Sequence, residues 1–435
     1  MSPRLQDGSA ASLGCAGLLS LVLLAGCGGS DAGSPASSTG PGGTVNDTSP
    51  PPAVTQAKEQ NTPVDPSLVT ADNTFGVNLL QALIQARPDT NIAISPTSVA
   101  MALQIVYNGA GGTTQTAMAQ TLQLGSLSVS QLNDDNAALS AALLTPDPQI
   151  TLTIANSLWV RLNSNPVSAT FISTDQTYYG AQIGDLAGAP ADVNTWGNTA
   201  TNGLIPQILS PNVSLSDINA LVANVVYFKG TWEYSFDPAK TAATPFTLAN
   251  RTQTSVDMMS QPNSAIPVLL GANFSAVALP YGQSGRMSMI VVLPNTGVDL
   301  SAFMSAMTVA DIQSWVGQMS VSVPVNLSLP RFTTSFGTSV KGALATLGMG
   351  VAFGDEADLS GIYSGAQISD VEHETVVKVD ETGTEAAGAT IIGITTTAVQ
   401  EPITVQINHP FFYAIRDNQT GALLFIGVMM NPNGG

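Results

Sequence analysis

The stretch ALVANVVYFKGTWE, residues 220–233, has the composition of a β-strand, because β-branched and aromatic side chains dominate it. Similar runs lie on both sides of it along the chain. They are TLTIANSLWV (151–160), FSAVALPY (274–281) and MSMIVVLP (287–294), the last two separated by a Gly/Ser turn. We therefore expect residues 220–233 to form one strand of a sheet.

Helical patterns precede this strand. Apolar residues recur at helical spacing across residues 68–86. Ser95 and Pro96 form a helix start, with a hydroxyl N-cap followed by proline at the first helical position. Gly109 supplies a C-terminal stop, and a further helix is predicted from Thr113 to Leu122.

The C-terminal part of the chain is mostly strand-like. Its predicted strands are VPVNLSLPRF (323–332), ETVVKVD (374–380), ITVQIN (403–408), FFYAIRD (411–417) and ALLFIGVMM (422–430), with a helix over SVKGALATLGM (339–349). Helices come early and strands late, without regular βαβ alternation or an internal repeat. This order predicts an α+β fold in a single domain over residues 68–435.

The composition limits the partners of the protein. Of its 435 residues, 44% are hydrophobic and only 10% are charged, and the formal net charge is −18. Such a balance argues against nucleic acid, other polyanions or an acidic membrane surface as partners. Cys15 and Cys27 both lie near the N-terminus, and His373 and His409 are the only histidines. We therefore expect no disulfide framework, metal site or cofactor in the globular part.

The N-terminal segment resembles a bacterial lipoprotein signal. Residues 13–25 are apolar but too few to span a bilayer, and they run into LAGC (24–27), which resembles a lipobox. The resemblance implies a signal peptide over residues 1–26 and lipidation of Cys27. An ordinary signal peptide with an incidental cysteine is the alternative. Gly28, in place of the aspartate of an inner-membrane retention signal, favours the outer membrane.

The segment after Cys27 predicts a tether. Residues 27–67 are rich in Gly, Ser, Pro and Thr and cannot bury apolar area, so we expect a flexible connection. The protein would then be secreted and held by its lipid at the outer membrane or cell surface, with the periplasm as a further location. The lipid would be its only membrane contact.

Catalytic templates do not fit the chain. GQSGR (282–286) has arginine where a nucleophile elbow needs its last glycine, and NGAGGTT (108–114) lacks the lysine of a phosphate loop. No Ser-x-x-Lys or His-Glu-x-x-His occurs. Asp355, Glu356 and Asp358 could form an acid pair, but loop and cap roles are favoured. His373 lies in a predicted strand, where a hydrogen-bonded structural role is favoured over a catalytic base. We therefore do not expect an enzyme.

The chain as a whole resembles the serpin family over nearly all of residues 68–433. The resemblance rests on segments that follow one another in the family's order. They are NIAISPTSVAMALQIVYNGAGGTTQTAMAQTL (91–122), ANSLWV (155–160), YYGAQIGDL (178–186), VNTWGNTATNGLIPQIL (193–209), LVANVVYFKGTWEYSFDP (221–238), PFTLANRTQTSVDMMSQ (245–261), LPYGQSGRMSMIVVLP (279–294), LSLPRF (327–332), LGMGVAFGDEADLSGI (347–362) and VDETGTEAAGAT (379–390).

The resemblance implies two functional regions around a central sheet. Ser95, Ser98, Asn224 and His373 match the polar cluster called the shutter, where hydrogen bonds help decide whether two central strands part. Trp232 matches the tryptophan of the breach, where an inserting strand first enters the sheet. Ordinary core packing is the other explanation for Trp232, and the two are compatible.

The resemblance also implies a hinge at the start of a reactive-centre loop. The matching residues are Glu381, Gly383, Thr384, Glu385, Ala386 and Ala387. In inhibitory serpins a protease attacks the scissile bond and forms an acyl-enzyme. The freed segment then inserts as a new strand and distorts the protease before water can hydrolyse the ester.

The residues after the hinge suit insertion. Residues 386–400 carry no charge and no aromatic ring. Alternate residues from Thr384 to Thr396 would face the core, and none of them is charged or bulky enough to hold the sheet open. Ladder hydrogen bonds at about 1 kcal/mol each and two buried isoleucines at about 2 kcal/mol each would yield on the order of ten kcal/mol. This favours inhibition over a non-inhibitory serpin-fold binding protein.

The scissile bond can be placed within three residues. Counting from Glu381 puts it between Thr397 and Ala398, whereas counting back from NHPFF (408–412) suggests cleavage after Val399. These small or β-branched residues suit serine proteases of elastase-like or subtilisin-like specificity. Cleavage at Ile394 by a chymotrypsin-like enzyme and inhibition of papain-like cysteine proteases remain alternatives. We expect the inhibitor to be a monomer.

Overall fold

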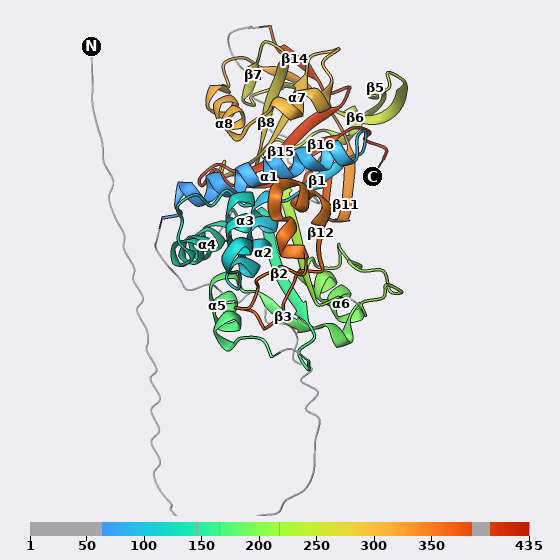
Figure 1. The fold of residues 1–435 in the computed structure, drawn as a ribbon. Coiled ribbons are helices and arrows are strands. Elements are labelled where there is room, and N and C mark those ends of the chain that lie inside the picture. Colours follow the sequence, from blue (N-terminus) through green and yellow to red (C-terminus); the bar gives the residue numbers. More distant parts are fainter. Residues whose placement is uncertain (1–62, 145–146, 165, 217, 385–400, 435) are drawn as a thin grey trace, which may run out of the picture. The chain divides into compact units, whose positions relative to one another are not determined.

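The computed structural model describes residues 63–144, 147–164, 166–216, 218–384 and 401–434. Helices and three β-sheets make up this part of the chain (Figure 1), so the predicted α+β class is confirmed. The predicted signal peptide, Cys27 and most of the predicted tether lie outside the described residues.

The helices lie mainly in the first half of the chain. The α-helices are α1 (Pro66–Ala86), α2 (Pro96–Tyr107), α3 (Gly112–Thr121), α4 (Val129–Leu143), α5 (Ala169–Tyr179), α6 (Ala191–Ala200), α7 (Leu300–Ala306), α8 (Val309–Gln318) and α9 (Lys341–Leu344). Shorter helical turns are η1 (Leu186–Gly188), η2 (Pro238–Lys240), η3 (Ala345–Met349) and η4 (Gly350–Phe353).

The strands form three sheets. The central sheet has the order β11 (Phe332–Ser339), β12 (Asp370–Asp380), β13 (Gly383–Thr384), β4 (Ala220–Thr231), β2 (Ile150–Val160) and β3 (Gln182–Asp185). The second has the order β1 (Ile92–Ile94), β16 (Leu423–Met429), β15 (Phe411–Asp417), β9 (Met287–Pro294), β8 (Phe274–Tyr281) and β7 (Val268–Leu270). The third has the order β14 (Ile403–Gln406), β10 (Val325–Pro330), β6 (Gln253–Ser264) and β5 (Ala242–Thr247).

The predicted helix over residues 339–349 was wrong in its extent. Regular α-helix ends at Leu344, and residues 345–349 form a wider turn. Gly348 has a φ of 111°, far from the helical value, and interrupts the helix there.

Strand β4 lies in the middle of the central sheet and is buried on both faces. This explains its nearly continuous apolar sequence, since a strand covered on both sides cannot alternate with polar residues. On one face it packs against α2. On the other, Leu221 and Val225 join a cluster with Trp196 of α6 and Trp159 of β2. The two tryptophan rings meet edge to face at 6.5 Å.

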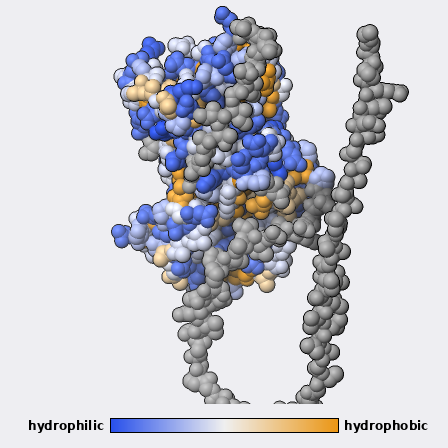
Figure 2. Space-filling model, turned by 180° about the vertical axis from the view of Figure 1, so that it is seen from behind, coloured by the Kyte–Doolittle hydropathy of each residue, from blue (hydrophilic) through white to orange (hydrophobic). Residues whose placement is uncertain are grey.

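The face in Figure 2 is mainly hydrophilic, with small separate apolar patches among the described residues. None of the helices in the described part combines the length and apolar character needed to cross a membrane.

The central sheet forks between β4 and β12. The two strands pair in parallel over residues 221–226 and 370–375. Beyond this pairing, β13 lies between them and pairs antiparallel with both. The fork brings the predicted site residues together.

Candidate functional site

The four predicted shutter residues lie in one buried hydrogen-bonded cluster below the fork. Ser95 caps α2, and Ser98 lies in the first turn of that helix. Asn224 of β4 and His373 of β12 are direct partners in the parallel register. All four side chains are fully buried.

His373 is held as a neutral imidazole of one tautomer. Its Nε2 accepts a hydrogen bond from the Ser95 backbone N–H at 3.1 Å, so the ring proton lies on Nδ1 and is donated to Asn224 Oδ1 at 2.8 Å. Burial lowers the pKa of His373 to about 3. Both ring nitrogens are therefore engaged in hydrogen bonds within the buried cluster.

Asn224 links β4 to three neighbouring elements. Besides its bond to His373, its Nδ2 donates to Ser98 Oγ at 2.5 Å and to Asn156 Oδ1 of β2 at 2.6 Å. Sequence reasoning missed Asn156. Its signal in the sequence was a polar side chain on a face of the predicted strand that is otherwise apolar.

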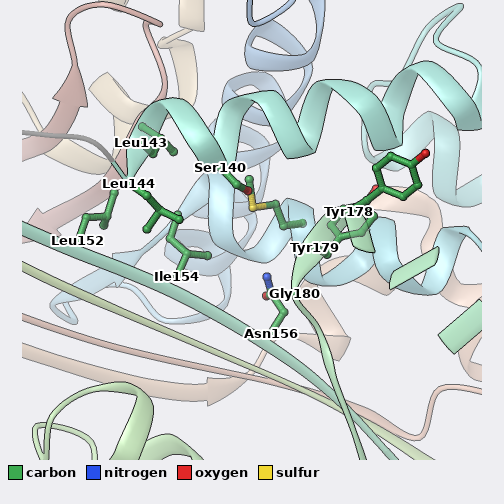
Figure 3. A pocket seen from close by; sticks show the side chains of 10 residues that line it. Ser140, Leu143, Leu144, Leu152, Ile154, Asn156, Tyr178, Tyr179 and Gly180 are labelled. Carbon is green, nitrogen blue, oxygen red and sulfur yellow. The ribbon is translucent and has the colours of Figure 1, made fainter. Parts of the chain in front are cut away.

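Asn156 also borders a small cavity of about 30 Å³, which suffices for a water molecule. Figure 3 shows Asn156 on β2 near Gly180 and Tyr179, with Leu143 and Ser140 of α4 on the opposite side. The central sheet is therefore incompletely packed next to the cluster, although a cavity of this size has no room for a ligand larger than water.

Gly383 and Thr384 of the predicted hinge already lie within the central sheet. Gly383 pairs with Thr231 and Asp380, and Thr384 pairs with Gly230 and Val379. Gly383 has a φ of 152°, and a Cβ there would lie 2.0 Å from the Gly230 carbonyl oxygen. Only glycine fits this position.

Two stacked aromatic side chains lie at the end of β13. The rings of Trp232 and Tyr281 stack at 4.4 Å, and the Tyr281 hydroxyl lies 2.7 Å from Thr384 Oγ1. Trp232 Nε1 donates to the Asp380 carbonyl at 2.9 Å, and its backbone N–H donates to the Thr382 carbonyl at 2.9 Å. Trp232 thus binds the turn that leads from β12 into β13. The sequence did not indicate this role of Tyr281, because the residue ends the predicted strand 274–281, whose composition indicates only packing.

Glu381 anchors the same turn. Its Oε1 accepts hydrogen bonds from Arg331 and from Thr241 Oγ1. Burial opposes ionisation of Glu381, but these hydrogen bonds and the Arg331 charge keep its pKa below the usual range. Arg331 lies between β10 and β11, and sequence reasoning did not single it out.

The remaining predicted loop residues lie outside the described part of the chain. They are Glu385, Ala386, Ala387, Thr397, Ala398 and Val399. Asp358 belongs to a turn in which its Oδ1 accepts from Ser360, as expected for a loop residue. Within the described ranges, no three His, Cys, Asp or Glu side chains gather as metal ligands.

Fold and site together define a class of protein. A strand end enters the central sheet of an α+β domain between two strands, which pair with each other further along over a buried polar cluster. The family model described as serpin (serine protease inhibitor) matches residues 70–432.

Known proteins are similar to this chain over nearly the same residues. The leukocyte elastase inhibitor of Homo sapiens is 31% identical over 382 residues, covering 84% of this chain and 99% of that protein. Leukocyte elastase inhibitor A of Mus musculus is 32% identical over 384 residues, with the same shares covered. The crystal structure of Tengpin, a thermophilic serpin in the native state, superposes with a TM-score of 0.77 at 27% identity and covers 86% of this chain and 96% of that one. This chain belongs to the serpin family.

The neutral His373 predicts a loss of stability in acid. Between about pH 6.5 and about pH 3 the unfolded chain binds a proton on this residue that the native state does not bind. Stability should therefore fall as the pH falls through this window, by on the order of 5 kcal/mol from this group. Urea unfolding at a series of pH values measures this loss. His373→Gln, which cannot titrate, should show a flatter profile, and parallel profiles would refute the assignment.

The hydrogen bond between Tyr281 and Thr384 should stabilise the position of the predicted hinge in the sheet. Tyr281→Phe keeps the ring stacked on Trp232 but leaves the buried Thr384 hydroxyl unpaired, at a cost of about 1–3 kcal/mol. We expect hydrogen exchange of the Thr384 amide to accelerate roughly tenfold or more. The matched control is Thr384→Ser, which keeps the hydroxyl and should exchange almost as slowly as the parent. Unchanged exchange in Tyr281→Phe would show that the contact does not hold the hinge.

Proposed function

We propose that this serpin is a suicide-substrate inhibitor of serine endopeptidases. The observation that carries the proposal is the position of Gly383 and Thr384, which are paired on both sides between β4 and β12. A strand in this position could lengthen into the sheet once the pairing of β4 with β12 beyond it is broken. Protease inhibition is also the activity named for relatives such as leukocyte elastase inhibitor.

The proposed reaction begins as ordinary proteolysis. The catalytic serine of the protease attacks the carbonyl carbon of the scissile residue, and the peptide C–N bond breaks. The new amine leaves with a proton, and the loop remains attached to the protease as an ester. Insertion of the segment after Thr384 then carries the ester away from its original position. Hydrolysis stops because the distorted protease no longer activates water.

The register of β13 predicts where the entering residues would lie. Continuing it from the Thr384–Gly230 and Thr384–Val379 pairs would bring Glu385 between Lys229 and Lys378. The same count would bring Thr390 between Asn224 and His373. A loop hydroxyl would then enter between the two residues whose hydrogen bond now closes the sheet.

Opening the sheet therefore has a local cost at the shutter. The Asn224–His373 hydrogen bond and the parallel pairing of 221–226 with 370–375 must be broken. Each broken backbone bond is replaced on both sides of the new strand, so the number of ladder bonds rises. The gain of about 1 kcal/mol per added bond favours the inserted state once cleavage frees the loop.

The choice of target follows from the residues around the proposed scissile bond. Thr397, Ala398 and Val399 are small or β-branched, and no lysine or arginine occurs between Glu381 and Arg416. We infer a protease of elastase-like or subtilisin-like specificity rather than a trypsin-like one. The inhibitor would act as a monomer, tethered through a lipid on Cys27 at the outer membrane or cell surface.

Covalent trapping is the direct test of inhibition. Mixed with elastase or subtilisin, the protein should form a complex that survives denaturing electrophoresis. Thr384→Arg would place a charge at a site that is 1% exposed, at a cost of several kcal/mol, and should convert the inhibitor into a substrate cleaved without trapping.

Thr384→Ser is the matched control for this experiment and should trap protease like the parent. Cleavage of the parent without any covalent complex would indicate a non-inhibitory serpin. A complex with papain alone would move the target to cysteine proteases. Trapping by Thr384→Arg at the parental level would refute insertion through Thr384.

A charge swap tests the proposed register. Glu385→Lys would align three cations across the inserted sheet, replacing two ion pairs worth about 0.2–1 kcal/mol each with repulsion. The fraction of inhibitor cleaved without trapping should rise. Lys378→Glu in the same chain should restore part of the trapping. No rescue by the second substitution would show that the loop enters in another register.

A further inference from the structure

Helix α2 is joined to two other helices by a repeated side-chain arrangement. Gln104 Nε2 donates to Asp72 Oδ1 of α1 at 2.8 Å. Asn108, four residues further on and at the end of α2, donates through Nδ2 to Asp175 Oδ1 of α5 at 2.7 Å. Asp72 is 1% exposed, and Gln104 and Asp175 are fully buried.

Each of the two pairs leaves the same two oxygens unsatisfied. In the first they are Asp72 Oδ2 and Gln104 Oε1, and in the second Asp175 Oδ2 and Asn108 Oδ1. All four atoms are buried acceptors without a hydrogen-bond partner in the described structure. Buried polar atoms of this kind cost free energy and are normally satisfied. One proton per pair would satisfy all four if the carboxyl O–H donated to the amide oxygen of the same pair.

The surroundings supply no positive charge in place of a proton. Helices α1, α2, α4 and α5 contain no lysine, arginine or histidine. Titratable side chains on α2, α4 and α5 are carboxyls or phenols: Tyr107, Asp134, Asp135, Tyr178 and Tyr179.

Cations on neighbouring elements bind elsewhere. Arg416 of β15, near Gly421 beside α1, donates to Asn418, and Arg87 at the end of α1 donates to Thr338. Lys341 of α9 donates to the Ser369 carbonyl, and Arg286, which also contacts the end of α4, pairs with Asp417. His373 lies at the other end of α2, against Ser95, and is neutral.

We propose that Asp72 and Asp175 are protonated in the native protein, and that each closes a two-bond ring with the amide of Gln104 or Asn108. The two rings would form a pH-sensitive lock that fixes α2 to α1 and α5. Burial is the largest influence on both carboxyls and raises the pKa of Asp72 and of Asp175 to about 8, although the amide hydrogen bond to each lowers it.

The lock bears on the candidate site because α2 carries Ser95 and Ser98 in its first turn. Ionisation would remove one hydrogen bond from each ring and leave a carboxylate oxygen facing an amide oxygen. The support of α2 under the central sheet should therefore weaken as the pH rises through about 8.

The sign of the pH dependence follows from the proton count. An unfolded aspartate ionises near 3.8, whereas the two native carboxyls keep their protons up to about 8. Between these values unfolding releases two protons, so the stability from these groups falls as the pH rises and becomes constant above about 8. This is opposite to the effect of His373, which acts at acid pH.

Asparagine is the matched replacement, since its N–H can donate where the acid O–H donated. In the double variant Asp72→Asn/Asp175→Asn both rings would form at any pH. The thermal midpoint of the parent should fall between about pH 5 and about pH 9 by roughly 3 °C or more beyond the fall in the double variant. Each single variant should show about half of that difference. Asp135→Asn on α4, outside both pairs, should follow the parent.

Infrared spectroscopy tests the protons directly. At neutral pH the carbonyl band of protonated carboxylic acid should be weaker in the double variant than in the parent by the share of two carboxyls, whereas Asp135→Asn should keep the parental intensity; Glu372 and Glu374, whose pKa values burial raises to about 7, contribute equally to the band in all three proteins. If the double variant does not fold, the single variants and a pH titration of the band in the parent provide the same evidence. The proposal would be overturned if the Asn variants kept the full parental band and their pH profiles ran parallel to that of the parent.

Discussion

The hydrogen-bonded junction of β4 and β12 is the constraint on which the rest of the structure depends. The strands pair in parallel at Asn224 and His373, and a few residues further on they are separated by Gly383 and Thr384. Because β4 and β12 pair directly with each other next to β13, β13 can lengthen only if these pairs break. The position of this junction therefore sets both how firmly Gly383 and Thr384 are held and how much work the proposed insertion would require.

Polar contacts of opposite character stabilise the two ends of the junction. Below it, Asn224 links β4 to α2, β2 and β12 through neutral hydrogen bonds in a fully buried site. Above it, Glu381 ties the turn to Arg331 and Thr241 nearer to solvent. The buried bonds are costly to leave unpaired, whereas the ion pair is partly screened by water. For the proposed insertion, breaking the buried bonds of Asn224 would therefore cost more than breaking the contacts of Glu381.

Much of this could be predicted from the sequence, since helix starts such as Ser95–Pro96 and strands such as residues 220–233 depend on local patterns. The family resemblance also indicated Asn224, His373 and Trp232. The early entry of Gly383 and Thr384 could not be predicted, because it depends on pairing between segments about 150 residues apart in the chain. Tyr281, Asn156 and Arg331 were missed for the same reason, since their hydrogen-bond partners lie on strands or turns distant in the sequence. The break at Gly348 reflects a backbone conformation that helical propensity does not encode.

The central claim is that the segment after Thr384 enters the sheet between β4 and β12 once the loop is cut. A crystal structure of the protein cleaved between Thr397 and Ala398 measures this most directly. The account predicts a continuous new strand from Gly383 onward, with Glu385 between Lys229 and Lys378 and with Asn224 no longer bonded to His373. A cleaved protein in which β4 and β12 still pair at Asn224 and His373, with the freed segment outside the sheet, would contradict it.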